Sequence, residues 1–391
     1  MDPIYIDDDR ALADLCQSLR AAPYLALDTE FMRERTYFPQ LCLIQLGAPG
    51  TIACIDPLRV GELSPLRELL LDPGIEKVLH AAHQDLELFF HRWQAVPAPV
   101  FDTQLAASLL GHGHQLGYAA LVQQLLGTSL SKAHSRADWS RRPLSAAELA
   151  YAADDVRYLM PVYERLRAEL AARDRLDWLQ AEATLAAEPG RYRPDPAQAW
   201  QRIGRTGSLK PASLAVLQGL AAWREQQAVD ADRPRQWLLK DDILVDIARR
   251  LPQEMSQLQR IRNLPEATLR KHGQTLLTLV ERHRQVPAPE MRARAPLGPA
   301  GEAAVDLLNA TLRLEAARLQ IAPQALAGRR ELEALAAGHP PAEILDGWRV
   351  AAIGPALEAA LAGRTALRIA PRPPAGPATA ELLDIAGEET P

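Results

Sequence analysis

Four carboxylates and one phenol, spread over residues 28 to 155, have the types and the order needed to act on a phosphate ester. These residues are Asp28, Glu30, Asp85, Tyr151 and Asp155. Mg²⁺ and Mn²⁺ prefer oxygen ligands, and two such ions about 4 Å apart can serve both the attacking and the leaving oxygen when a phosphodiester is hydrolysed. The pattern therefore predicts a nuclease site that holds two divalent metal ions, Mg²⁺ or Mn²⁺.

The first two carboxylates follow an apolar run that predicts a buried strand, Tyr24-Leu-Ala-Leu27. Because alternate residues of a strand share a face, Asp28 and Glu30 are expected to point the same way. Asp85 lies where another strand runs into a helix, a position that also suits a carboxylate that caps the helix. Asp102, just before a further predicted helix, is interpreted as such a cap.

The last two residues of the set lie on a predicted helix. Ser145 and Glu148 have the spacing of a capping box, which opens a helix that runs to about residue 171. Tyr151 and Asp155 are four residues apart and therefore share a face of this helix. Asp154 could reach the same face, so helix geometry alone leaves the choice between Asp154 and Asp155 open.

Strand and helix patterns alternate in the first half of the chain and give way to helices alone. The predicted strands span 24 to 31, 41 to 46, 51 to 56, 76 to 81 and 98 to 101. With the helices between them they predict a mixed α/β domain over residues 1 to 195. Helical periodicity then predicts two all-α domains, at 205 to 287 and 299 to 366, joined by a Pro-rich linker. The tail, 367 to 391, is rich in Pro and Ala with one short apolar stretch, Glu381-Leu-Leu-Asp-Ile385, and most of it is expected to be disordered.

Composition argues against several classes of protein. Apolar residues make up 48% of the chain and charged residues 24%, as in soluble globular proteins, and no apolar run is long enough to cross a membrane. The acidic N-terminal segment does not resemble a secretory signal, so a cytoplasmic protein is expected. Cys16, Cys42 and Cys54 lack the spacing of a disulfide framework or of a thiolate zinc site and are expected to be reduced.

Five motifs together resemble a known family. They are Leu27-Asp-Thr-Glu-Phe31, His80-Ala-Ala-His-Gln-Asp-Leu-Glu87, Phe101-Asp-Thr-Gln104, Asp138-Trp-Ser-Arg-Arg-Pro-Leu144 and Tyr151-Ala-Ala-Asp-Asp-Val156. In them the chain resembles the DEDD exonucleases, specifically the tyrosine-bearing branch that includes ribonuclease D. The resemblance implies an α/β fold, a ribonuclease H-like mixed sheet with flanking helices, followed by all-α helical domains.

The resemblance also implies a role for each residue of the set. Asp28, Glu30 and Asp155 would hold the metal on the nucleophile side, which favours Asp155 over its neighbour. Asp28 and Asp85 would hold the metal on the leaving-group side. Tyr151 would align the attacking water by a hydrogen bond, because a phenol with a pKa near 10 is a poor general base at neutral pH.

Two further residues are assigned to the substrate. His80, His83 and His91 match no common structural zinc spacing and are interpreted as packing or substrate-facing residues, and His80 is the one assigned to substrate binding. Lys132 lies upstream of Asp138, where the family's pattern leads us to expect a lysine.

The helical part resembles HRDC domains, modules shared by ribonuclease D and certain helicases. Residues 223 to 252 carry the resemblance, and residues 317 to 327 resemble a second, degenerate copy. Net charge is +5 over residues 201 to 290, which suits a nucleic-acid partner but is also common on solvated helices. Six basic side chains could contact phosphates there: Arg224, Arg233, Arg235, Lys240, Arg249 and Arg250. Trp223 and Trp237 are interpreted as core residues rather than base-stacking platforms.

By this resemblance we expect a metal-dependent 3′-5′ exoribonuclease that releases nucleoside 5′-monophosphates and trims tRNA precursors and other structured small RNAs. No obligate protein partner is evident. The residues alone do not separate RNA from DNA, so a 3′-5′ DNA exonuclease is the nearest alternative. A noncatalytic RNA-binding scaffold is the alternative of another class, and it predicts that ligands are lost, whereas all five expected positions are filled.

Overall fold

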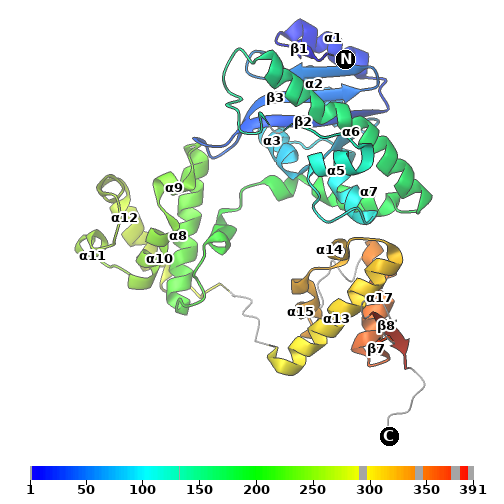
Figure 1. Ribbon diagram of the computed structural model, residues 1–391. Helices are drawn as coiled ribbons and strands as arrows, with labels where there is room; N and C mark the ends of the chain where they lie inside the picture. Colours follow the sequence, from blue (N-terminus) through cyan, green and yellow to red (C-terminus); the bar gives the residue numbers. More distant parts are fainter. Residues whose placement is uncertain (1, 132, 290–296, 340–346, 371–378, 386–391) are drawn as a thin grey trace.

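The N-terminal part of the chain forms one six-stranded mixed sheet. A computed structural model describes residues 2 to 131, 133 to 289, 297 to 339, 347 to 370 and 379 to 385. The strands are β1 (Ile4–Ile6), β2 (Tyr24–Met32), β3 (Gln40–Ala48), β4 (Thr51–Ile55), β5 (Glu76–Leu79) and β6 (Val100–Asp102). Their order is β1-β4-β3-β2-β5-β6, with β3 antiparallel to both neighbours and the other pairs parallel (Figure 1).

The central strand β2 is buried on both faces of the sheet. Leu25 and Leu27 belong to the apolar layer on one face, and Ala26 belongs to the layer on the other. The first layer includes helices α1 (Asp9–Leu19), α2 (Ser64–Leu71) and α3 (His83–Trp93), and the second includes α4 (Thr103–Leu109), α5 (Tyr118–Leu126) and α6 (Ala146–Ala172). Because side chains alternate along a strand, Asp28 and Glu30 continue on the face that α6 covers.

Helix α6 begins where the capping box was predicted. The Ser145 hydroxyl accepts a hydrogen bond from the Glu148 N–H, and the Glu148 carboxylate accepts one from the Ser145 N–H. Gly47 on β3 lets the helix come close, since a Cβ at this glycine would lie 3.1 Å from the Val156 Cβ. The residues next to Val156 are thereby brought down to the sheet.

The first helical domain has an apolar core of its own. It follows α7 (Leu176–Ala186) and η1 (Pro189–Tyr192), and consists of η2 (Pro196–Arg202), α8 (Pro211–Asp230), α9 (Arg235–Leu238), α10 (Asp241–Arg250), α11 (Met255–Gln259) and α12 (Glu266–His283). Trp223 packs against this core. The expectation that Trp237 is also a core residue is wrong: it is 63% exposed, because the single turn of α9 buries none of its residues.

The second helical module shares a core with the first domain of the chain. Its helices are α13 (Gly298–Leu319), α14 (Pro323–Leu326), α15 (Arg329–Ala336) and α17 (Gly347–Leu361). Their buried residues join the apolar layer of α4 and α6 in one continuous cluster. Trp348 stacks on Trp178 of α7 with ring centroids 4.7 Å apart, and the Ala322 N–H donates to the Ser108 carbonyl over 3.0 Å.

The tail contains two paired strands, one of them where disorder was expected. β7 (Thr365–Ile369) and β8 (Ala380–Asp384) form an antiparallel pair in which Leu367 lies opposite Leu382. The expectation of disorder is wrong for residues 367 to 369, which belong to β7, whereas β8 lies over the apolar stretch that was set apart; each strand satisfies the other's backbone hydrogen bonds. The remaining tail residues, 371 to 378 and 386 to 391, lie outside the described residues.

Candidate active site

Three of the predicted ligands meet between β2 and α6. Asp28, Glu30 and Asp155 each offer a carboxylate oxygen, and these oxygens lie within 4.8 Å of one another. The three residues line a cavity of about 210 Å³ together with Thr29, His80, Tyr118, Tyr151 and Leu159. Strand alternation and helix packing thus bring together residues that are more than 120 positions apart in the sequence.

Asp85 lies beside this triad, in the first turn of α3, and is 7% exposed. Its carboxylate accepts a hydrogen bond from the hydroxyl of Thr29, the residue between the two acidic residues of β2. Asp85 does not cap the helix, because the N-cap position is occupied by Ala82, but as the acidic residue of the first turn it complements the helix dipole.

The two neighbouring aspartates of α6 have different contacts in the structure. Asp154 forms an ion pair with Arg157 on the same helix. Asp155 belongs to the triad, and its carbonyl oxygen accepts a hydrogen bond of 2.5 Å from the Tyr118 hydroxyl, which anchors this turn of the helix. Asp155 is therefore the candidate ligand by geometry.

Tyr151 presents its ring to the cavity between two other aromatic rings. Its centroid lies 6.2 Å from that of Trp139, at 29° between planes, and 5.8 Å from that of His134. Burial and the nearby acidic residues, Asp155 first, raise the pKa of Tyr151 to about 12. The phenol therefore stays protonated at neutral pH and can donate a hydrogen bond.

Burial raises the pKa of all four carboxylates of the site. Burial, followed by the charges of Asp155 and Asp85, raises the pKa of Glu30 to about 8. Burial likewise raises the pKa of Asp28 well above its usual range, and those of Asp85 and Asp155 to about 7. Within the described ranges, none of the four forms an ion pair with Lys or Arg. Buried oxygen ligands without a cationic partner are the donor set that hard divalent cations require.

His80 lines the cavity, and Asp102 lies at the start of the helix that follows β6. Asp102 caps α4, as predicted, by accepting hydrogen bonds from the Gln104 and Leu105 N–H groups, and it also accepts one from the Ala82 N–H. The His80 Nδ1 lies 3.0 Å from the Thr103 Oγ1. Burial lowers the pKa of His80, so the imidazole is neutral at pH 7. Lys132 lies outside the described residues.

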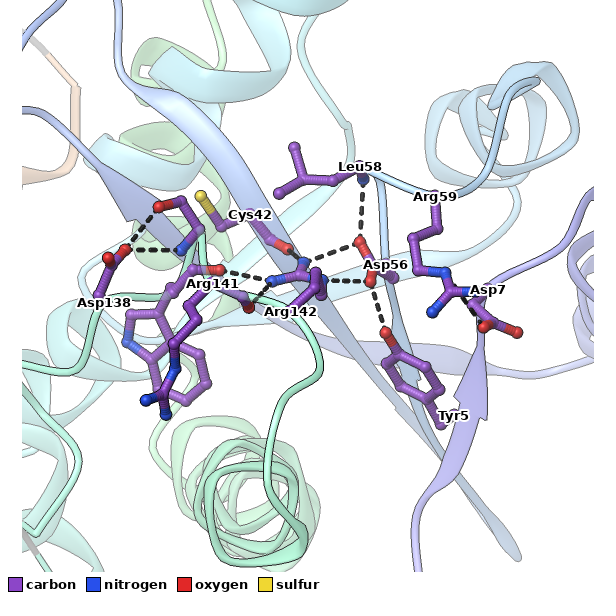
Figure 2. A network of polar contacts seen from close by, with 11 residues as sticks. Tyr5, Asp7, Cys42, Asp56, Leu58, Arg59, Asp138, Arg141 and Arg142 are labelled. Carbon is purple, nitrogen blue, oxygen red and sulfur yellow. Dashed lines mark hydrogen bonds and ion pairs between the residues drawn. The ribbon is translucent and has the colours of Figure 1, made fainter.

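A buried ion pair fixes the segment that leads into α6. Arg142 donates hydrogen bonds to both carboxylate oxygens of Asp56, the residue that follows β4, and Tyr5 of β1 donates to the same carboxylate (Figure 2). The guanidinium also donates to the carbonyl oxygens of Cys42, over 2.6 Å, and of Trp139, over 2.7 Å. The backbone of Trp139, whose ring stacks on Tyr151, is thereby tied to β3.

The basic residues expected to contact RNA are not equivalent. Arg224 is 2% exposed, donates to the Leu239 carbonyl over 2.7 Å and pairs with Asp241. The expectation that Arg224 contacts phosphate is therefore wrong, because its guanidinium is already bound to partners inside the domain. Lys240, which precedes α10, is exposed.

Arg235 belongs to a set of contacts between the first helical domain and the β2–β3 loop. We call these contacts the joint; they are formed by Arg235, Glu225 and Asp232 of the domain and by Tyr37 and Phe38 of the loop. Its guanidinium lies 5.8 Å from the centroid of the Tyr37 ring and 3.5 Å from Glu225. The Tyr37 hydroxyl donates to Glu225 over 2.6 Å, and the N–H groups of Tyr37 and Phe38 donate to Asp232 over 3.0 Å each. The strand that carries Asp28 and Glu30 is thus connected to α8 by its own loop.

Comparison with known proteins places this geometry in a family. Residues 3 to 171 match a family model described as 3′-5′ exonuclease, and residues 213 to 280 match that of the HRDC domain. The chain is 41% identical to ribonuclease D of Acidiphilium cryptum over 361 residues, which cover 90% of this chain and 91% of that protein. The chain belongs to the ribonuclease D family.

Solved structures agree with this membership. The crystal structure of Escherichia coli RNase D, an exoribonuclease involved in structured RNA processing, matches with a TM-score of 0.82 and 35% identity, covering 93% of this chain and 99% of that one. The catalytic core of RRP6 from Trypanosoma brucei shares the fold, with a TM-score of 0.57, 24% identity and coverage of 72% and 80%. The predicted fold class, an HRDC domain and the enzyme class, a 3′-5′ exoribonuclease of the ribonuclease D family, are confirmed. None of the helices in the described part of the chain has the length and apolarity needed to traverse a bilayer.

Proposed function

We propose that the chain removes nucleoside 5′-monophosphates from the 3′ end of RNA with two divalent metal ions held by four carboxylates: Asp28, Glu30, Asp85 and Asp155. The observation that carries this proposal is the meeting of three of these carboxylates within 4.8 Å, with the fourth beside them. Cations bound there would balance the buried charge, activate water and stabilise the leaving oxygen. Asp28, as the central residue, is assigned to both ions.

The remaining residues of the cavity orient the reactants. Tyr151, a protonated phenol, donates a hydrogen bond that aligns the attacking water. Its position is set by the stacked Trp139 ring and by the capped start of α6. His80, neutral and held by Thr103, is proposed to contact the terminal nucleotide. Lys132 is proposed to contact the substrate phosphate.

The first helical domain is proposed to bind the RNA upstream of the cleaved end. Arg205, Arg249 and Arg262 line a cleft of about 600 Å³ in this domain together with three aspartates. Two of these aspartates pair with arginines that are not part of the lining. The three lining arginines therefore face only one aspartate outside these pairs, and with the exposed Lys240 they suit a phosphate backbone. We propose that these residues take the role first assigned to Arg224.

The substrates are proposed to be tRNA precursors and other structured small RNAs, acted on in the cytoplasm without an obligate protein partner. The second helical module is proposed to be a degenerate HRDC domain. Its long helix, one-turn helix and following helices, α13, α14, α15 and α17, repeat the order of α8, α9, α10 and α12.

The test is a time course on 3′-labelled and 5′-labelled tRNA precursor, with DNA of matched sequence, in Mg²⁺ and in EDTA, for the wild type and Asp28→Asn. We expect 5′-monophosphates from the RNA 3′ end in Mg²⁺ only, and none from the variant. Equal cleavage of DNA would refute the assignment to RNA. Binding of RNA without cleavage by the wild type would favour the scaffold alternative.

A further inference from the structure

Gln45 on β3 is a fully buried amide whose hydrogen-bonding groups are not used. The residue is 0% exposed, and neither its Oε1 nor its Nε2 has a partner among the described residues. A buried polar group without a hydrogen bond is unfavourable, and native proteins contain very few. An apolar side chain of the same length would fill this space without that cost. The amide is therefore explained better by a role in function than by a role in packing.

The sheet register places this amide next to the proposed metal site. Gln45 lies directly opposite Asp28 on β2 and opposite Cys54 on β4. Residues that face each other on antiparallel strands project to the same side of the sheet, with Cβ atoms roughly 5 Å apart. Cys54 belongs to the apolar layer that α6 covers, so Gln45 and Asp28 share the side of the sheet on which Asp155 lies.

We propose that Gln45 positions Asp28 for metal binding, by donating a hydrogen bond from its Nε2 to the Asp28 carboxylate when that carboxylate holds a divalent cation. A carboxylate that binds a cation keeps lone pairs for other donors, and such hydrogen bonds fix its orientation. Gln45 acts through Asp28 and does not touch the substrate, so it is a positioning residue. The inference rests on the proposed metal site.

The test compares Gln45→Met with the wild type in the absence of RNA. Mn²⁺ binding is measured by isothermal titration calorimetry, and the thermal midpoint is measured in EDTA. We expect affinity for Mn²⁺ to fall roughly 10- to 100-fold, the usual effect of losing such a partner of a metal ligand. We expect the midpoint in EDTA to be unchanged or higher, because the unsatisfied amide is gone. Gln40→Met, at the exposed start of the same strand, is the matched control and should alter neither quantity.

Each result of this experiment either supports or overturns the proposed role of Gln45. Wild-type affinity for Mn²⁺ in Gln45→Met would overturn the proposal. A lower midpoint in EDTA, or a failure to fold, would call for Gln45→Leu. If that variant also loses stability, the amide supports the metal-free fold and the proposal is again overturned. Failure of the wild type to bind Mn²⁺ would instead refute the proposed function, so the two failures are distinguishable.

Discussion

Replacing Glu30 by glutamine should stabilise the metal-free protein while abolishing its activity. In the folded state burial and the charges of Asp155 and Asp85 raise the pKa of Glu30 to about 8, from a usual value of 4.5. Between these values the folded chain keeps a proton that the unfolded chain releases. The free energy of unfolding therefore falls as pH rises through this window, and the neutral glutamine escapes that loss.

The size of the effect follows from the width of the window. Each pH unit inside it costs about 1.4 kcal/mol, so raising the pH from 5 to 7 should cost the wild type about 3 kcal/mol that Glu30→Gln does not lose. For a domain of this size, 1 kcal/mol corresponds to roughly 2 to 4 °C in the thermal midpoint. The advantage of the variant should thus grow by roughly 6 to 12 °C between pH 5 and pH 7.

Thermal denaturation in EDTA at the two pH values measures this difference. Glu34→Gln, which replaces an exposed glutamate just beyond the same strand, is the matched control and should give equal differences at both pH values. Addition of Mg²⁺ should raise the midpoint of the wild type more than that of Glu30→Gln. If the advantage of Glu30→Gln over the wild type is the same at pH 5 and pH 7, the pKa of Glu30 is not raised in the folded protein and the reasoning is refuted.

Three other predictions concern the site and its surroundings. Asp155→Asn should lower RNA cleavage at least about 100-fold, and Asp154→Asn less than about threefold, since only the first belongs to the triad; equal losses would argue against the assignment. Tyr151→Phe should lower kcat roughly 10- to 100-fold and leave the pH-rate profile between pH 7 and 10 unchanged, because the phenol does not ionise there; a lost ionisation would show that it acts as a base. Tyr37→Phe should weaken the joint by about 1 to 2 kcal/mol and raise KM for long RNA more than for a dinucleotide, because the joint holds the domain proposed to bind upstream RNA; parallel changes would contradict this role of the joint.

The sequence predicted the site residues on β2 better than those on α6. Alternation along a strand has a fixed period of two, so the common direction of Asp28 and Glu30 could be predicted from the apolar run before them. On α6 the spacing admitted both Asp154 and Asp155. The choice depends on how the helix packs on β3, where Gly47 allows close approach, and spacing within one helix does not contain that information.

Side chains that make tertiary contacts were harder to predict. Nothing in the run of basic residues distinguishes Arg224, whose guanidinium meets an interior carbonyl, from its exposed neighbours. Trp237 has the composition of a core residue, yet it lies on a helical turn too short to have a buried face. The apolar faces of α13 and α17 indicated a helical domain correctly, but an apolar stripe does not say whether its partner is the same module or a distant one.

The core shared by α6, α7, α13, α14, α15 and α17 has a consequence for synthesis of the chain on the ribosome. The apolar surface near Trp178 is made early, but the helix that carries Trp348 emerges only after about 170 further residues have been translated. At roughly 5 to 20 residues per second this interval lasts about 10 to 35 s. During that time the nascent exonuclease domain exposes an apolar face whose packing partner has not yet been made. Such a face is the kind of surface to which chaperones bind. The intervening HRDC domain has a core of its own. It can therefore fold before the core of the exonuclease domain is complete.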